Sequence, residues 1–455
     1  MSIVPVVFED QSLIGFRPLA WSVPPGELRC GLLNARERLT HLVGREPFLL
    51  VRSMLQKLAA EGGYQVALDS LEASLLEGAR LLLVSGRVGP CWDLLTSAYE
   101  AAAADEDLAW CDEDGWLVMS AKGDQAMAML KSWSEWEQSA TSTGCWQDPH
   151  TVVPAWEPSL ALEPRTKAGA LHRIWDLVPA TAQAISDDLA HIRGCLPARR
   201  VWGALPVDDS PSWARAVPLM PWSEVDHPQV HIREAGNILV GEDCDIAPGV
   251  SIDARSGPVV LGREVRILPG AFLEGPLYVG SGSLIKAGSA IYGETSLGAM
   301  NKVAGEIGES TFLDLANKQH EGFIGHAYLG SWCNLGALTT CSDLKNTYGS
   351  IRVDLGHGSE DTGQRFVGLL MGEHGKTAIG TLFNTGTSVG FASNIFSTGF
   401  PGKCLPCYTW GDGTGDQRHD FLRAAATAAT AMERRGCRLG AGHEDLFRIL
   451  GEGVG

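Results

Sequence analysis

The second half of the chain carries an aliphatic side chain at every sixth position. The run starts at Leu261 and consists of Leu261, Ile267, Leu273, Val279, Ile285, Ile291, Leu297 and Val303. Neither a helix of period 3.6 nor a simple strand of period 2 produces a strict period of six. The pattern therefore predicts a parallel β-helix, in which each hexad is one short strand plus a turn and three hexads form a coil of about 18 residues.

Residues 18 positions apart, such as Leu261, Val279 and Leu297, should then stack about 4.8 Å apart on one face as neighbouring strands. The aliphatic positions fill the interior, and small residues occupy corners that need positive φ or a close backbone approach. Glycine usage agrees, since 39 of the 54 glycines lie in residues 231–455. Prisms of this repeat class are left-handed and are usually completed by trimerisation, so we expect a left-handed β-helix and a homotrimer.

The first half has the opposite composition, with 12 of the 14 tryptophans before residue 231. Such a difference in tryptophan and glycine content between the halves predicts that each half has its own fold. The alternation of apolar strands and helical segments in the first half indicates an α/β layer domain of the Rossmann-like class. Buried strands are expected at Ile3–Phe8 and Arg80–Ser85 and a hairpin at Leu108–Ser120. Helices are expected over 46–60, 92–104 and 175–192.

Six prolines lie in residues 197–228 and mark the junction between the two folds. We therefore divide the chain into an α/β domain (1–196), a Pro-rich junction (197–230), a β-helix (231–411) and a C-terminal segment (412–455). The C-terminal segment is expected to form a helix over 420–438 and a short one over 440–450, packed against the prism or a neighbouring subunit.

The formal charge is −18, which opposes a nucleic acid or an anionic membrane surface as the main partner. No apolar run approaches the roughly 20 residues needed to span a bilayer. The first residues show no basic region followed by an apolar core and a small-residue cleavage site, and the eleven cysteines show no framework spacing, so we expect no export and a cytoplasmic location. Cys404 and Cys407 form a lone CxxC, which we interpret as structural rather than as a zinc or redox site.

The hexad rhythm fails between Val303 and Ile324, and the departing stretch is polar. Loops that leave a rigid scaffold are where binding and catalytic residues are usually placed. A passive oligomerising stalk is the alternative, but a stalk needs only the hexads. His320 and His326 lie near this break and raise the question of a metal site, which we disfavour because no third histidine has a suitable spacing.

Several segments around the break resemble one known family. They are residues 302–307 (KVAGEI), 317–323 (NKQHEGF), 332–336 (WCNLG), 343–349 (DLKNTYG) and 383–387 (FNTGT). Together they look like the sugar nucleotidyltransferase family related to the bifunctional N-acetylglucosamine-1-phosphate uridyltransferase/glucosamine-1-phosphate N-acetyltransferase. The resemblance is dense from about Gly236 to Trp410 and thinner, though present, in the first half of the chain.

In that family the β-helix transfers an acetyl group from acetyl-CoA to a sugar amine, a step on the way to UDP-N-acetylglucosamine. The resemblance implies that His320 is the catalytic base and that Asn334 lies near the acetyl group. The chemistry is consistent, since an imidazole with a pKa near 6.5 can accept the amine proton at neutral pH. The substrate-binding residues implied are Asn317, Lys302, Lys318, Phe323, Asp343 and Lys345.

The sequence also departs from the family pattern. Leu268 stands where the family has an arginine that contacts the sugar phosphate, Phe323 replaces a tyrosine, and Asp343 stands near a family asparagine. Phosphate recognition would therefore have to use other cations. The candidates are Lys286, Lys302, Lys318 and Lys345. The acceptor can consequently differ from glucosamine 1-phosphate.

The first half lacks the Gly-rich loop that normally follows the first strand of a nucleotidyltransferase and cradles the triphosphate. Arg17, Arg29 and Arg36 instead suggest a phosphate site, because a guanidinium can grip phosphate oxygens bidentately. The alternative for Arg36 is a solvated helix face. Nucleotidyl transfer also needs Mg²⁺, for which Asp93 and Asp176 are candidate ligands, although either can equally be a helix cap.

The first hypothesis is thus an enzyme that joins a nucleoside triphosphate to a sugar 1-phosphate and also acetylates an amino-sugar phosphate. A second keeps only the acyltransferase, with the first half as a degenerate nucleotide-binding or regulatory domain. A third is a non-enzymatic trimeric scaffold.

Overall fold

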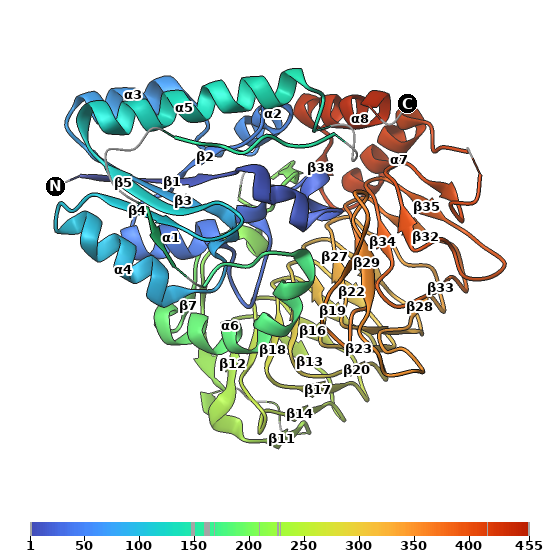
Figure 1. Cartoon of the computed structure of the whole chain (residues 1–455). Coiled ribbons are helices and arrows are strands. Elements are labelled where there is room, and N and C mark those ends of the chain that lie inside the picture. Colours follow the sequence, from blue (N-terminus) through green and yellow to red (C-terminus); the bar gives the residue numbers. More distant parts are fainter. Residues whose placement is uncertain are drawn as a thin grey trace.

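The computed structural model describes residues 2–146, 151–158, 164–167, 169–208, 210–224, 227, 229–415 and 417–453. An α/β domain and a long β-helix lie side by side in it, and the C-terminal helices return to the first domain (Figure 1). The expected fold classes for both halves are confirmed, with an α/β domain on a mixed sheet in the first half and a left-handed β-solenoid in the second.

The first domain is built on a six-stranded sheet of order β2-β1-β3-β5-β4-β6. Its strands are β1 (Ile3–Phe8), β2 (Phe48–Leu50), β3 (Arg80–Ser85), β4 (Leu108–Cys111), β5 (Trp116–Ala121) and β6 (Arg165–Thr166). The first three are parallel, and β4 and β5 form the expected antiparallel hairpin. Both apolar runs predicted as strands, β1 and β3, lie in the middle of the sheet, where helices cover both faces.

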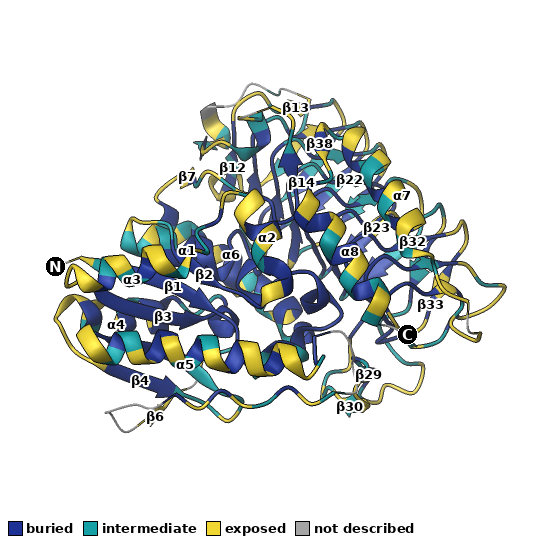
Figure 2. Ribbon diagram, turned by 90° about the horizontal axis from the view of Figure 1, so that it is seen from above, coloured by how far each residue is buried: buried dark blue, intermediate teal, exposed yellow. Residues whose placement is uncertain are grey.

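Helices cover the two faces of this sheet (Figure 1). They are α1 (Ala35–Val43), α2 (Ser53–Glu61), α3 (Leu68–Leu76), α4 (Trp92–Ala103), α5 (Gly123–Ser142) and α6 (Leu177–Ile192). Helix α5 shows exposed residues on its outer side and buried ones toward the sheet (Figure 2). The helix expected over 46–60 is wrong in its first part, because residues 48–50 pair with β1 as an edge strand and only then does α2 begin.

The β-helix has three faces of stacked parallel strands. The first face contains β12 (Ile238–Val240), β15 (Val259–Leu261), β18 (Leu277–Val279), β21 (Thr295–Leu297), β24 (Thr311–Phe312), β27 (Tyr328–Leu329), β31 (Leu370–Met371), β34 (Ser388–Val389) and β36 (Cys404–Leu405). The second contains β11 (His231–Arg233), β14 (Ser251–Asp253), β17 (Phe272–Glu274), β20 (Ala290–Ile291), β23 (Glu306–Gly308) and β26 (Phe323–Gly325), and farther along β28 (Thr340–Cys341) pairs with β33 (Leu382–Phe383). The third contains β13 (Asp245–Ile246), β16 (Arg266–Ile267), β19 (Leu284–Ile285), β22 (Lys302–Val303) and β25 (Asn317–Lys318), followed by β32 (Lys376–Thr377), β35 (Asn394–Ile395) and β37 (Trp410–Gly411).

The hexad residues occupy the interior as predicted. Leu261 pairs with Val279 and Val279 with Leu297, so these residues of successive coils are stacked neighbours, and all three are fully buried. The glycine excess has a physical cause at the corners. A Cβ on Gly262 would lie 2.6 Å from the backbone nitrogen of Ser281 in the next coil, so that corner has no room for a side chain.

The α/β domain packs on the outside of the first β-helix face. Val260 and Tyr278 share a hydrophobic cluster with Leu33 and Ile185 of the first domain. The Tyr328 hydroxyl farther along the face donates to the backbone oxygen of Arg29 at 2.8 Å. The two halves therefore form one packed body, in which one face of the prism is covered by its own chain.

The Pro-rich stretch and the C-terminus connect the two halves. Strand β7 (Cys195–Leu196) pairs with β9 (Val217–Pro218), and β10 (Met220–Pro221) extends the first β-helix face. Helix α7 (Phe421–Glu433) ends before the expected residue 438, because the chain turns there into β38 (Cys437–Arg438), which pairs with β8 (Leu205–Pro206).

The last helix, α8 (Ala441–Gly453), packs on α2 of the first domain. A Cβ on Gly442 would lie 2.5 Å from the backbone nitrogen of Leu58, so the two helices approach closely at this glycine. None of the helices in the described part of the chain is both long and apolar enough to cross a membrane.

Candidate functional site

The hexad rhythm breaks where successive coils differ in length. Lys302 pairs with Asn317, and Asn317 bridges to Asn334, so both of these coils are shorter than a regular coil of three hexads. Asn334 then bridges to Lys376, much farther along the chain, because a hairpin of β29 (Arg352–Asp354) and β30 (Ser359–Asp361) is inserted between them. The four side chains therefore form an outward column on the third face, which we call the polar column.

His320 lies in the loop that follows Asn317 and Lys318, and its side chain is exposed. It lines a groove of about 400 Å³ together with Lys286, Glu321, Leu268 and other residues. The loop shape depends on Gly322, whose φ is 130° and whose Cβ position lies 2.2 Å from the Thr339 backbone oxygen. The sequence-predicted base is thus presented at an open groove by a loop whose conformation only glycine accommodates.

Lys318 is placed differently from the substrate contact that the resemblance implies. It occupies the interior position opposite Val303 and is 1% exposed. Its ammonium donates to the backbone oxygens of Ala304 at 2.8 Å and of His320 at 2.7 Å. Burial lowers its pKa to about 8. Lys318 therefore acts on the site through the backbone of His320.

Lys302, Asn317 and Asn334 are brought together, as the resemblance implies, but around a second cavity of about 290 Å³. Gln319 lines both this cavity and the His320 groove, so the two are neighbours. The chain just after helix α7 reaches the second cavity, where the Arg435 Nη2 donates to Asn317 Oδ1 at 2.6 Å. This intrachain contribution from the C-terminal segment is absent from the sequence prediction.

Phe323, Asp343 and Lys345 are not among the residues that line either space. The carboxylate of Asp343 is 2.8 Å from the Nδ1 of His326, whose ring stacks on Phe366. The Lys345 ammonium donates to the backbone oxygen of Ser350. Asp343 and Lys345 therefore lie in the segment that leads into the inserted hairpin. Phe323 lies on β26, where its ring and the Asp343 carboxylate both approach Gly325.

The predicted nucleotide-binding arginines are buried and have internal partners. Arg29 donates to both carboxylate oxygens of Asp314 at 3.2 Å. Arg36 pairs with Glu27 and, at 2.8 Å, with Glu46. Arg17 donates to the backbone oxygen of Cys145 at 3.2 Å, and its guanidinium lies 3.9 Å from the ring of Trp21. Their exposures are 2–3%, so they stabilise the domain and its contact with the β-helix.

The predicted magnesium ligands lie at helix starts. Asp93 is exposed in the first turn of α4, and Asp176 accepts from the backbone N–H groups of His172 and Arg173 just before α6. Over the described residues, no three histidine, cysteine, aspartate or glutamate side chains are grouped so that they could hold a metal ion. The magnesium assignment of Asp93 and Asp176 therefore stays a prediction.

The carboxyl ends of β1 and β3, where α/β folds usually bind ligands, are filled by the chain itself. Glu9 pairs with Arg52, and Arg87 pairs with Asp112. A Cβ on Gly86 would lie 2.4 Å from the backbone nitrogen of Gly26, so residues 24–27 cross directly over the end of β3. This backbone occupies the place where a Gly-rich loop would be expected.

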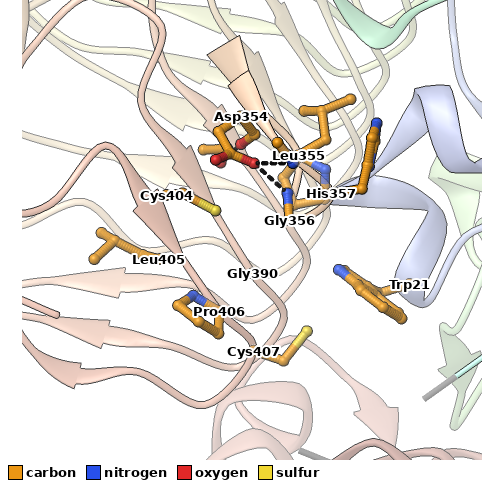
Figure 3. Close-up of a pocket in the computed structure, with 13 residues that line it drawn as sticks. Trp21, Asp354, Leu355, Gly356, His357, Gly390, Cys404, Leu405, Pro406 and Cys407 are labelled. Atoms are coloured by element: carbon orange, nitrogen blue, oxygen red, sulfur yellow. Dashed lines mark hydrogen bonds between the residues drawn. The ribbon is translucent and has the colours of Figure 1, made fainter. Parts of the chain in front are cut away.

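A further pocket, of about 440 Å³, lies between the two halves (Figure 3). Trp21 comes from the first domain, Asp354 and His357 from the hairpin, and Cys404 and Cys407 from the β-helix. The Asp354 carboxylate accepts from the backbone N–H of Gly356 at 2.8 Å, which shapes the hairpin turn. Sequence reasoning missed this pocket because its walls are far apart in the chain.

The CxxC cysteines line this pocket as free thiols. Burial raises the pKa of Cys407 to about 12 and also raises the pKa of Cys404. A high pKa disfavours the thiolate that redox chemistry requires, which agrees with a structural interpretation.

The comparisons with known proteins bear on the first half. Residues 5–195 match the model of a family described as sugar nucleotidyl transferase. The N-terminal α/β domain is therefore similar in sequence to sugar nucleotidyl transferases, and in this chain it is joined to a left-handed β-helix. No curated protein matches the chain.

Proposed function

We propose that the chain is a two-part sugar-phosphate enzyme. The first domain joins a nucleoside triphosphate to a sugar 1-phosphate and releases pyrophosphate, and the β-helix acetylates an amino-sugar phosphate from acetyl-CoA. The family match of residues 5–195 supports the first activity. The observation that carries the second is His320, exposed at the edge of the groove where the hexad repeat breaks.

The proposed acyl transfer assigns a proton path to His320. The sugar amine attacks the thioester carbonyl, the imidazole of His320 takes the amine proton, and the C–S bond breaks to release CoA, which recovers the proton. Lys318 holds the backbone of His320 in place from inside the prism. Lys286, which lines the same groove, supplies a positive charge for an anionic substrate.

The test is release of CoA on incubation with acetyl-CoA and glucosamine 1-phosphate or another amino-sugar phosphate. H320A should lower kcat by about 10²–10⁴-fold and leave the circular dichroism spectrum unchanged. H231A is the matched control, since His231 is exposed on β11 at the far end of the prism. Equal activity of H320A and wild type would refute the assignment of His320 as the base. The scaffold hypothesis predicts this result.

The second candidate function keeps only the acyltransferase. It is favoured by the ion pairs and backbone that fill the carboxyl ends of β1 and β3. Pyrophosphate release from UTP and N-acetylglucosamine 1-phosphate in magnesium buffer separates the two candidates. Release supports the bifunctional enzyme, whereas calorimetric binding of UTP without release identifies the first domain as a binding or regulatory module.

We also propose that the chain assembles as a homotrimer through the prism surface that its own first domain leaves open. Support comes from exposed apolar side chains on successive coils, among them Leu338 (56% exposed), Ile379 (78%) and Phe396 (40%). Leu338 also lines the His320 groove, so a neighbouring subunit seated there would help to close it. Light scattering should give three times the chain mass of 48.6 kDa, and a mass of one chain would contradict the trimer.

A further inference from the structure

The cavity beside the polar column has four cationic side chains in its wall. Lys302 and Lys376 come from the third face of the β-helix, and Arg434 and Arg435 come from the end of α7. They belong to three segments that are far apart in the sequence, so the folded chain assembles the cluster. No aspartate or glutamate is among the described residues that line the cavity.

The four cations lack anionic partners within the described residues. Lys376 donates to the backbone oxygen of His374, and Arg435 donates to the backbone oxygen of Met300 and to the side chain of Asn317. No ion pair is formed by any of the four in the part of the chain that the structure describes. What distinguishes these four is that they gather around one cavity, in a protein whose 54 acidic residues outnumber its 36 basic ones.

The electrostatics of the cluster are unfavourable without a counter-ion. Burial lowers the pKa of Lys302, and the positive charges of Arg435 and Arg434 lower it further. Burial and Arg434 likewise lower the pKa of Arg435, and burial lowers that of Lys376. The carbonyl end of α7 contributes only about half a negative charge, which leaves the cavity strongly positive.

Trp332, whose side chain also lines the cavity, carries a buried donor. Trp332 is 5% exposed, and its indole N–H has no hydrogen-bond acceptor among the described residues. A buried donor of this kind costs free energy unless a ligand or water satisfies it. Four cations around a space of about 290 Å³ are the features of a site for an oxyanion.

We propose that this cavity binds the phosphate group of a small-molecule ligand, held between the polar column and the end of α7 of the same chain. Its volume admits a phosphate and part of the group that carries it. Because Gln319 lines both this cavity and the His320 groove, the rest of the ligand can extend toward the proposed base. The phosphate can come from an amino-sugar phosphate or from the nucleotide end of an acyl-CoA, and this choice of source rests on the function proposed above.

Isothermal titration of the full chain with inorganic phosphate, glucosamine 1-phosphate and adenosine 3′,5′-bisphosphate tests the site. The double variant K302M/R434Q should weaken binding of the preferred probe by about a hundredfold, since each charge-assisted hydrogen bond is worth about tenfold or more. R423Q is the matched control, because Arg423 lies exposed on the same helix about 16 Å from Arg434. Arg435 is left intact because it also contacts the β-helix backbone.

The three probes identify the source of the phosphate. Tighter binding of the sugar phosphate assigns the acceptor, and tighter binding of the bisphosphate assigns the acyl donor. Absence of heat with all three probes at millimolar concentration, or equal affinities of wild type and K302M/R434Q, overturns the proposal.

The phosphate-binding test can succeed or fail independently of the test of acyl transfer. H320A should bind the phosphate probe as wild type does, even where CoA release is lost. If phosphate binds but no amino sugar is acetylated, the proposed function fails and the site stands. If acetylation proceeds at the wild-type KM in K302M/R434Q and no probe binds, the site fails and the function stands.

Discussion

Lys318 allows a quantitative test of how the break in the repeat is built. The contribution of Lys318 to the free energy of unfolding should increase between pH 8 and pH 10.5, because the folded state lowers the pKa of this lysine to about 8 from a usual 10.5. In that window the unfolded chain binds the proton and the folded chain has lost it, so stability rises with pH. At about 1.4 kcal/mol per pH unit, this difference in pKa corresponds to about 3 kcal/mol.

K318M removes this titration and keeps most of the side-chain volume. The difference in unfolding free energy between K318M and wild type should therefore change by about 3 kcal/mol in favour of the wild type from pH 7.5 to pH 10.5. Urea unfolding followed by circular dichroism at several pH values measures it. K131M is the control, since the side chain of Lys131 is 77% exposed on α5. Parallel curves for K318M and wild type would refute the reasoning.

The remaining predictions concern two buried carboxyl groups and the glycine of the His320 loop. Burial raises the pKa of Glu373 to about 8, so the stability of the wild type relative to E373Q should fall by up to about 5 kcal/mol as pH rises from 4.5 to 8. The difference between the urea unfolding free energies of the two proteins at pH 5 and pH 9 measures it, and an equal difference at both pH values would contradict the prediction. D188N removes the fully buried partner of Arg38 and should cost about 3–5 kcal/mol in equilibrium unfolding, whereas a loss below about 1 kcal/mol would contradict the pairing. G322A forces a Cβ against the Thr339 carbonyl and should slow CoA release about a hundredfold while thermal unfolding still reports a folded protein.

The β-helix was predictable in detail because its coils repeat along a single axis. Each coil contacts mainly its neighbours, so a single inward position per hexad determines the stack. Leu261, Val279 and Leu297 pair as the spacing requires. The period says nothing about what an inserted segment does, and the hairpin of residues 352–361 illustrates this. It folds back toward the first domain, where Glu360 pairs with Arg173 at 2.9 Å.

The α/β domain was predictable for its apolar strands and less so for its short and amphipathic elements. Residues 48–50 lie beside a helix in sequence and form a strand only because β1 offers an open edge. The arginines illustrate a second limit. Residue type suggests phosphate binding for Arg29, but its partner Asp314 is 285 residues away, and no sequence pattern indicates that contact.

The cationic cavity was missed for a related reason. Arg434 and Arg435 follow an Ala-rich helix and look like an ordinary solvated helix end, where basic residues are favoured. Lys376 lies in the outward position before the interior residue Thr377, but the inserted hairpin separates it in sequence from Asn334, its neighbour in the polar column. If the hexad register is resumed after the insertion, Lys376 falls in the column. The sequence predicts a C-terminal helix against the prism or a neighbouring subunit, but it does not say that α7 ends beside this column.

These contacts bear on whether the β-helix is a passive stalk. A stalk is most stable with an aliphatic residue at every interior position, yet the chain places Lys318 there, next to the loop of His320. It also leaves four cations unpaired beside that loop within the described residues, although carboxylates are abundant. Both features disfavour folding, and proteins retain such features chiefly at functional sites. Their occurrence together, at the point where the repeat breaks, favours a ligand-binding and catalytic β-helix over a scaffold.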